Sequence, residues 1–277
     1  MDFIKKIFDS IYSNVSAEWW LWAFIFITLI FPIIYSSIKG ENNKNFKSKN
    51  FITDCIYSFF EMFHIWQFLI IVPLSVFLGK FLNENFSFIT IGFISSFPIW
   101  VQLFVLFIVM DLSVYLVHRF QHSNIYAWQF HKTHHSQKFL TALTTFRKTI
   151  LDRVFELLLL SLPAFILSID YTFPLYIVMI TTFHQLIIHT DTSFTFGIFG
   201  KIIVSPSFHE LHHSIDEKHK YANFGGVLTI WDKLFGTYMS SNNKIKYGIS
   251  DEKIPENFFS QLIVPIVGLL RLFKNRK

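Results

Sequence analysis

The 277-residue sequence has a single cysteine, Cys55, and few charged residues. One cysteine excludes an intrachain disulfide, so nothing in the sequence indicates an oxidising compartment. Charged residues make up 16% of the chain and hydrophobic ones 52%, whereas soluble domains carry about 25% charged residues. A cleavable signal peptide is not expected, because the first apolar run is long and lacks a small-residue cleavage site. The scarcity of charge therefore predicts an integral membrane protein.

A continuous basic stripe is also absent. The formal net charge of +5 is modest, and the lysine and arginine residues lie between the apolar runs. In that position they orient a chain in a bilayer rather than bind phosphates. We therefore expect no nucleic-acid partner.

Apolar runs long enough, or nearly long enough, to cross a bilayer occur five times along the chain. They are Trp19–Ile38, Ile56–Gly79, Ile99–Val117, Val154–Ile169 and Phe173–Ile188. The last two are short, and we interpret them as a helical hairpin through the membrane. The stretch 86–97 is apolar but contains Ser, Thr and Gly, so it is either re-entrant or leads into the third span. This pattern predicts an all-α, multi-pass membrane bundle of about four to five spans.

The positive-inside rule orients these spans. With the loop 39–49 in the cytoplasm, 21 of the 24 lysine and arginine residues fall on the cytoplasmic side. The same orientation places every cluster of histidines at or just beyond the cytoplasmic face. The sequence therefore predicts a cytosolic cap that carries the histidines.

Both ends of the chain contain amphipathic segments. Residues 2–12 gather Phe3, Ile4, Ile7, Phe8 and Ile11 on one helix face, which suits a helix in the membrane interface. Residues 258–273 are apolar but interrupted by Pro265, and we expect them to lie on or partly in the membrane rather than to span it. We therefore expect the chain to consist of three parts. Residues 1–98 contain the interfacial helix and the first two spans, residues 99–240 contain the histidines, and residues 241–277 form the amphipathic tail.

Ten of the twelve histidines fall into the four groups "HRFQH", "HKTHH", "HQLIIH" and "HELHH". These are His118, His122, His131, His134, His135, His184, His189, His209, His212 and His213. Residues i, i+3 and i+4 share a helix face, so each H-x-x-H-H can present up to three ring nitrogens to one place. His184 and His189 lie about 140° apart around a regular helix and converge only if the helix is distorted. Imidazoles buried beside a bilayer are costly unless paired or ligated, so the pattern predicts metal binding.

Ten histidines are too many for one ion, because structural zinc takes four ligands and catalytic zinc takes three plus water. Two ions with four or five imidazoles each use the histidines and leave a position open. Imidazole suits Zn, Cu, Fe and Ni, so the ligand type does not name the metal.

"HELHH" supports a second hypothesis. It also fits the H-E-x-x-H zinc metalloprotease signature, with His209 and His213 as ligands and Glu210 as general base. That hypothesis gives the other histidine groups no role. A non-enzymatic metal-binding membrane protein is a further alternative, although the spans lack the aligned ionisable residues that an ion path needs.

The order of the motifs resembles the sterol desaturase / fatty acid hydroxylase superfamily of membrane di-iron enzymes. The resemblance extends from Asp111 to Tyr238 and rests on "DLSVYLVHRFQH", "WQFHKTHHS", "TTFRKTILDRVFE", "HQLIIHTD" and "SPSFHELHHSIDEKHKYANFGGVLTIWDKLFGTY". It implies two iron ions held by the histidines in a cytosolic cap, with O₂ as co-substrate. It also implies electrons from a small electron-transfer protein and its reductase. Zinc is expected as a contaminant, since it outranks ferrous iron in affinity.

The implied reaction is hydroxylation or desaturation of a C–H bond of a membrane lipid. The lipid is left open among acyl chain, sphingolipid, ether lipid, sterol and carotenoid. The implied location is a bacterial inner membrane or the endoplasmic reticulum, with the histidine site on the cytoplasmic side.

Five further residues are candidates to support the ligands. Asp111 lies seven residues before His118 on the same helix face, so it can accept a hydrogen bond from a ligating histidine. Tyr115 is either at the substrate entrance or an interfacial aromatic. Asn223 and Asp232 match the tail of the last motif, and His219 is a loop histidine close to it. His64 is expected either to pack inside the second span or to line a lipid tunnel there.

Overall fold

The computed structural model describes residues 48–168, 172–240, 245–250 and 252–275. The predicted interfacial helix and the first predicted span lie outside these residues. Within them, β structure is limited to two isolated bridges, between Ile203 and Leu228 and between Ser214 and Tyr247. All other regular elements are helices. The prediction of an all-α fold is confirmed.

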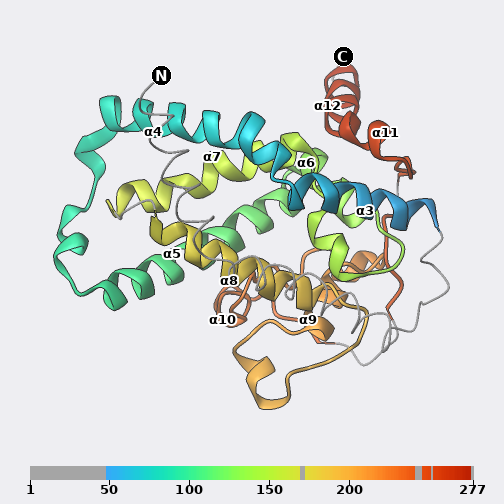
Figure 1. Cartoon of the computed structure of the whole chain (residues 1–277). Helices are drawn as coiled ribbons and strands as arrows, with labels where there is room; N and C mark the ends of the chain where they lie inside the picture. The colour runs from blue at the N-terminus through green and yellow to red at the C-terminus, as the bar shows by residue number, and fades with distance from the viewer. Residues whose placement is uncertain (1–47, 169–171, 241–244, 251, 276–277) are drawn as a thin grey trace.

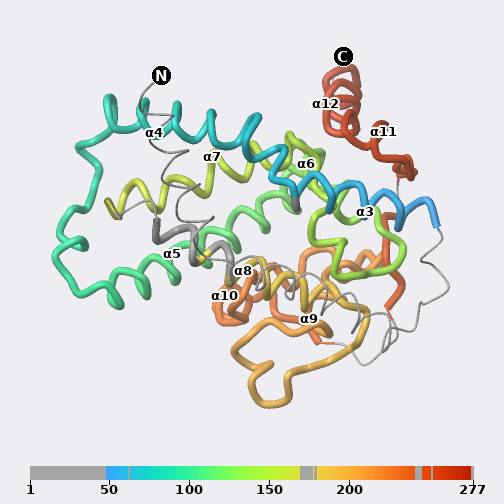
Figure 2. Tube along the Cα trace, in the orientation of Figure 1, coloured from blue at the N-terminus to red at the C-terminus, as the bar shows by residue number. Residues whose placement is uncertain are grey.

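Four long helices run side by side and form a bundle (Figure 1). They are α4 (Val72–Phe86), α5 (Ile99–Ser123), α7 (Ile150–Ile166) and α8 (Thr172–Ile188). Their core includes Ile94, Leu106, Leu167 and Ile177. Two short 3₁₀ turns, η3 (Ser87–Ile89) and η4 (Gly92–Ser96), connect α4 to α5 at the end of the bundle far from α9 (Figure 2).

Two helical segments, Gln67–Ile89 and Ile99–Ser123, are long and apolar enough to cross a membrane. Large apolar side chains point outward along them, including Leu69, Phe77, Trp100 and Phe104. Soluble proteins rarely expose such continuous apolar surface, so lipid is the natural solvent for it. The helices α7 and α8 have 17 residues each and reach about 25 Å, close to the roughly 30 Å of a hydrocarbon core.

The second predicted span, Ile56–Gly79, is wrong in its boundaries. Helix α3 (Lys49–Met62) covers the first residues of this range and ends within it, and His64 then adopts a left-handed conformation with φ of 51°. The chain then continues through the π-helical turn η2 (Gln67–Ile71) into α4. The buried face of α3 is largely polar and packs on the cap rather than on lipid. His64 is exposed at the break instead of packed in a span.

The cap lies at the other end of the bundle. It consists of α6 (Ile125–His135), η5 (Ala142–Phe146), η6 (Gly197–Lys201), α9 (Pro206–His212), η7 (Glu217–His219), α10 (Ile230–Leu234), α11 (Phe258–Leu262) and α12 (Val264–Lys274). Asn124 ends α5 and caps α6, because its side-chain oxygen accepts from the amides of Tyr126 and Ala127. The corner therefore falls directly after His122. Pro265 lies in the first turn of α12 rather than breaking a helix, because the first turn needs no amide donor.

A fully buried ion pair ties α3 to two parts of the cap. The Arg147 guanidinium, at the end of η5, contacts the Asp54 carboxylate on α3 and the carbonyl oxygen of Thr133 on α6. Gln137 and Thr144 also donate to Asp54. A buried charge of this kind is tolerated only when it is fully paired and hydrogen-bonded. The network fixes the turn of α6 that carries the "HKTHH" histidines.

Candidate metal centre

Nine of the ten predicted histidines converge in two adjacent groups. The first group is His118, His122, His131, His135 and His212, and the second is His134, His189, His209 and His213. Within each group, one ring nitrogen of every residue lies within 4.8 Å of the others. The groups touch where the rings of His135 and His213 stack with centroids 4.4 Å apart. Eight of the nine side chains are buried, and His118 is half-buried.

Each H-x-x-H-H motif contributes to both groups. On α6, His131 and His135 face the first group while His134 faces the second. On α9 the division is reversed, with His212 in the first group and His209 and His213 in the second. Neighbouring residues on a helix point about 100° apart, so the i+3 and i+4 side chains separate when two sites flank the helix. Of the three nitrogens that one motif can present to one place, two therefore go to one group and one to the other.

The "HQLIIH" motif supplies one histidine. Helix α8 ends at Ile188, and His189 follows with its Nε2 3.1 Å from His134 Nε2 and 3.0 Å from His209 Nε2. His184 does not join either group, because its Nε2 lies 2.8 Å from the carbonyl oxygen of Val204. The helix is not distorted to bring the pair together, and we leave His184 out of the proposed ligand set.

Backbone carbonyls fix the protonation of three rings. The Nδ1 atoms of His118, His189 and His212 lie 3.0, 2.8 and 2.9 Å from the carbonyl oxygens of Phe224, Gln185 and Ala222. A carbonyl oxygen only accepts, so each Nδ1 carries the proton and each Nε2 presents a lone pair to its group. This is the arrangement by which a ligating histidine is oriented from behind.

Burial favours the neutral form of six of the rings. Burial lowers the pKa of both His189 and His212 to about 3. Burial, followed by the neighbouring imidazoles, lowers the pKa of His134, His135, His209 and His213 well below the usual value. Neutral imidazole is the form that binds metal. These groups therefore need no proton loss to act as ligands at neutral pH.

The donor set fits a divalent cation in each group. In the first group, His135 Nε2 lies 3.1 Å from both His122 Nε2 and His212 Nε2. In the second group, His189 Nε2 lies at a similar distance from the Nε2 atoms of His134 and His209. The Nε2 atoms of His118 and His131 are buried without a hydrogen-bond partner among the described residues. Inward lone pairs at this spacing repel one another unless a cation lies between them. Five and four imidazoles match the expected number per ion.

Asn223 and Asp232 support the carbonyls that orient the first group. Asn223 lies between Ala222 and Phe224 with φ of 62°, a left-handed conformation that asparagine tolerates. Its side chain donates to Phe208 and exchanges hydrogen bonds with the Met239 backbone. Asp232 accepts from the amides of Phe224 and Gly225. Both residues thus act on His118 and His212 through the backbone.

The other supporting candidates act differently from the expectation. Asp111 accepts from the amides of Val227 and Leu228 and from the Trp231 indole, and from no histidine. It anchors the 227–231 segment to α5. Tyr115 is fully buried, with its hydroxyl 2.9 Å from Thr237 Oγ1, so it does not form an entrance. His219 is buried on η7, outside both groups.

Two supporting residues were missed in the sequence. Asp152 Oδ2 lies 3.6 Å from His131 Nδ1, and its other oxygen accepts from Gln121. The Thr145 hydroxyl lies 3.1 Å from His189 Nδ1. Both belong to "TTFRKTILDRVFE". Asp152 could have been found as the acidic residue in the first turn of α7, whereas Thr145 has no such signal.

Glu210 faces away from both groups. Its carboxylate accepts from the amides of Thr192 and Ser193, at 3.0 and 2.7 Å, and from the Ser193 hydroxyl at 3.0 Å. A metalloprotease base must instead face water bound to the metal. Here the carboxylate holds α9 against the turn that follows His189.

Comparison with known proteins identifies one matching family model and several relatives that are similar in sequence. Residues 103–237 match the family model described as fatty acid hydroxylase. Alkylglycerol monooxygenase from Danio rerio is 27% identical over 184 residues, which cover 65% of this chain and 38% of that protein. Ornithine lipid hydroxylase OlsE from Rhizobium tropici is 29% identical over 172 residues, 61% of this chain and 52% of that protein.

The alkylglycerol monooxygenase from Homo sapiens is 31% identical over 172 residues, 60% of this chain and 36% of that protein. The chain thus spans about half, or less, of the length of the curated relatives that it matches. No solved structure matches it.

Proposed function

Because this chain belongs to the sterol desaturase / fatty acid hydroxylase superfamily, we propose that it is a membrane oxidoreductase that uses O₂ to hydroxylate a C–H bond of a lipid. The observation that carries the proposal is the pair of adjacent all-histidine groups, in which eight of the nine side chains are buried. Two of the relatives named above are a lipid hydroxylase and a monooxygenase.

The proposed cofactor is two iron ions, one in each histidine group. Bound iron would supply the one-electron and O₂ chemistry that protein side chains cannot perform. The overall reaction converts C–H, O₂, two electrons and two protons into C–OH and water. In a desaturation the same inputs remove two hydrogen atoms from adjacent carbons and give two water molecules. Electrons come from a separate small redox protein and its reductase.

The residues of the chain position this chemistry. The carbonyls of Ala222, Phe224 and Gln185 orient three rings, and Asp152 lies behind a fourth. Burial lowers the pKa of His189 and His212, which favours the neutral form of these two rings. Glu210 is engaged with the turn at Ser193, which disfavours the protease hypothesis.

The proposed topology places the cap in the cytoplasm. It can be tested by cysteine labelling after Cys55 is replaced by serine, because no other cysteine interferes. Single cysteines at Lys138 and Lys201 are expected to label from the cytoplasmic side, and one at Asn85 from the opposite side. Labelling of Lys138 and Lys201 from opposite faces would rule out a common cap.

The activity is tested by lipid analysis of cells with and without the gene under ¹⁸O₂. We expect a lipid present only with the gene to carry one ¹⁸O atom in a new hydroxyl group. A desaturation is recognised by a loss of two mass units without ¹⁸O. An unchanged lipid profile in cells whose protein is folded and iron-loaded would contradict the proposed function.

A further inference from the structure

Two segments of the cap, residues 194–202 and residues 230–235, together expose a large apolar surface. They contain η6 and α10, and the β-bridge between Ile203 and Leu228 holds them side by side. Six of their apolar side chains are each between 52% and 73% exposed: Phe194, Ile198, Phe199, Ile202, Ile230 and Leu234. Soluble proteins rarely leave such a patch facing water. We call these two segments the apolar lobe.

The lobe is anchored beside the middle of α5 rather than beyond its end. Asp111 on α5 accepts from the Val227 and Leu228 amides and from the indole of Trp231 in α10. Figure 1 shows α10 alongside α5 and α8. Asp111 precedes His118 by seven residues, so at 1.5 Å per residue it lies about 10 Å deeper along the helix. A hydrocarbon core of roughly 30 Å, counted from the start of α5, ends near the level of His118. The anchor point therefore lies at hydrocarbon depth.

Helix α8 holds the lobe from a second side. The Gln185 side chain on α8 donates to the Gly226 carbonyl oxygen at 2.9 Å. A Cβ atom on Gly226 would lie 2.9 Å from the Val114 side chain, so this segment packs directly on α5. Outward side chains at a similar depth on the two helices are also apolar and exposed, namely Leu116 on α5 and Ile180 on α8. The lobe thus lies at the level of the apolar outer surface of the bundle.

The backbone of the lobe pairs its polar groups internally. The Phe199 carbonyl oxygen accepts from the amides of Ile202 and Ile203 at 2.9 and 2.8 Å. The Ile202 carbonyl oxygen accepts from the Thr229 amide at 2.8 Å, which joins the loop to the start of α10. Asp111 satisfies two further amides, as described above. Irregular backbone is tolerated at membrane depth only when its polar groups are satisfied in this way.

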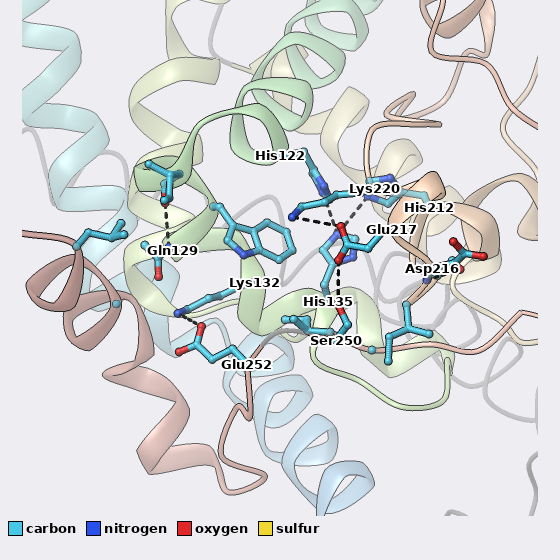
Figure 3. Close-up of a pocket in the computed structure, with 18 of the residues that line it drawn as sticks. His122, Gln129, Lys132, His135, His212, Asp216, Glu217, Lys220, Ser250 and Glu252 are labelled. Carbon is cyan, nitrogen blue, oxygen red and sulfur yellow. Dashed lines mark hydrogen bonds and ion pairs between the residues drawn. The ribbon is translucent and has the colours of Figure 1, made fainter. Parts of the chain in front are cut away.

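Charge is distributed unevenly over the cap. A pocket of about 390 Å³ reaches His122, His135 and His212 (Figure 3). Its lining includes six charged side chains and no residue of the lobe; the six are Lys132, Asp216, Glu217, Lys220, Glu252 and Arg271. Within residues 194–202 and 230–235, exposed charge is limited to Lys201 and Lys233. Two cations without an exposed anion suit lipid phosphates, which lysine reaches by extending its stem along apolar surface.

We propose that the apolar lobe is inserted among the lipid acyl chains of the leaflet on the cap side of the membrane, beside α5 and α8. Its base lies about 10 Å below the level of His118, comparable with the roughly 5–10 Å to which interfacial elements penetrate. A soluble protein partner is disfavoured, because it would have to enter the hydrocarbon to cover this surface. The inference concerns the membrane contact of the cap and does not depend on the proposed reaction.

Spin labelling of the full-length protein in vesicles of phosphatidylcholine and phosphatidylglycerol tests the inference. Single cysteines replace Ile198 and Leu234 in a Cys55→Ser background, and each carries a nitroxide. Electron paramagnetic resonance then compares collisions with O₂, which concentrates in hydrocarbon, and with a water-soluble nickel chelate, which hydrocarbon excludes. We expect the ratio of O₂ to nickel collisions at both positions to be severalfold higher than at a position that faces water.

The chain offers matched controls for both environments. Ile215 is an exposed isoleucine in the lining of the charged pocket, and a label there is expected to favour the nickel chelate. Phe77 is exposed on α4 within a segment able to cross the membrane, and its label should favour O₂. Thermal unfolding of each variant verifies the fold. Labels at Phe199 and Ile230 replace any lobe variant that fails to fold.

The labelling has three distinguishable outcomes. A preference for O₂ at the lobe positions, similar to that at Phe77, supports the proposal. Nickel access equal to that at Ile215 would overturn it, because the lobe would then lie in water. Shielding from both reagents would also overturn it, because another protein or a second copy of this chain would then cover the lobe. The readout needs neither substrate nor reductant, so a failure of the proposed reaction leaves it unaffected.

Discussion

His212→Ala is expected to abolish O₂-dependent lipid oxidation, whereas Glu210→Gln is expected to keep a measurable share of it. His212 presents its Nε2 to the first histidine group, and its loss removes a proposed iron ligand. We expect activity to fall by more than about 100-fold, beyond the 10–100-fold typical of residues that only support a ligand. Iron content should fall in parallel.

Glu210→Gln keeps the shape of the side chain and one acceptor for the Thr192 and Ser193 amides. We expect full metal content and a loss of activity of at most about tenfold. A metalloprotease predicts the reverse order, because its glutamate activates water while the ligand set stays intact.

The measurement is product formation and metal analysis for each purified variant. His184→Ala is the matched control, since it removes a histidine that bonds the Val204 carbonyl outside both groups. Thermal unfolding of each variant separates loss of a ligand from loss of the fold. If Glu210→Gln is inactive with full metal content while His212→Ala stays active, the proposed class of enzyme is wrong.

The spacing of the histidines carried most of the information about the candidate site. Ligands four residues apart on a helix must share a face, so His118 with His122 and His131 with His135 were predictable as pairs. Which pair belongs to which group was not predictable. That depends on how α6 and α9 lie on either side of the centre, and only the tertiary structure sets this.

The second predicted span shows a different limit. The residues around His64 are apolar on both sides, and hydropathy alone joins them into one helix. The break arises because the buried face of α3 is committed to the Arg147 network in the cap. A contact between residues 54 and 147 has no local signal in the sequence.

Asp111 was identified from its place in an apolar helix, but its partner was not. The sequence offered His118 seven residues away, whereas the structure supplies the backbone of residues 227 and 228. Backbone donors from a distant loop leave no pattern in the sequence. For the same reason the carbonyls of Ala222 and Phe224, which orient two of the histidines, could not be anticipated.

The central claim is that the chain holds two metal ions, one in each histidine group. Protein purified from iron-supplemented cells is expected to contain about two metal ions per chain, counting iron and any zinc together. Replacing His118 and His122 by alanine should reduce the count to about one, and so should replacing His209 and His213, because each pair serves a different group. A count of about one in the unaltered protein that does not change when His118 and His122 are replaced would contradict the account.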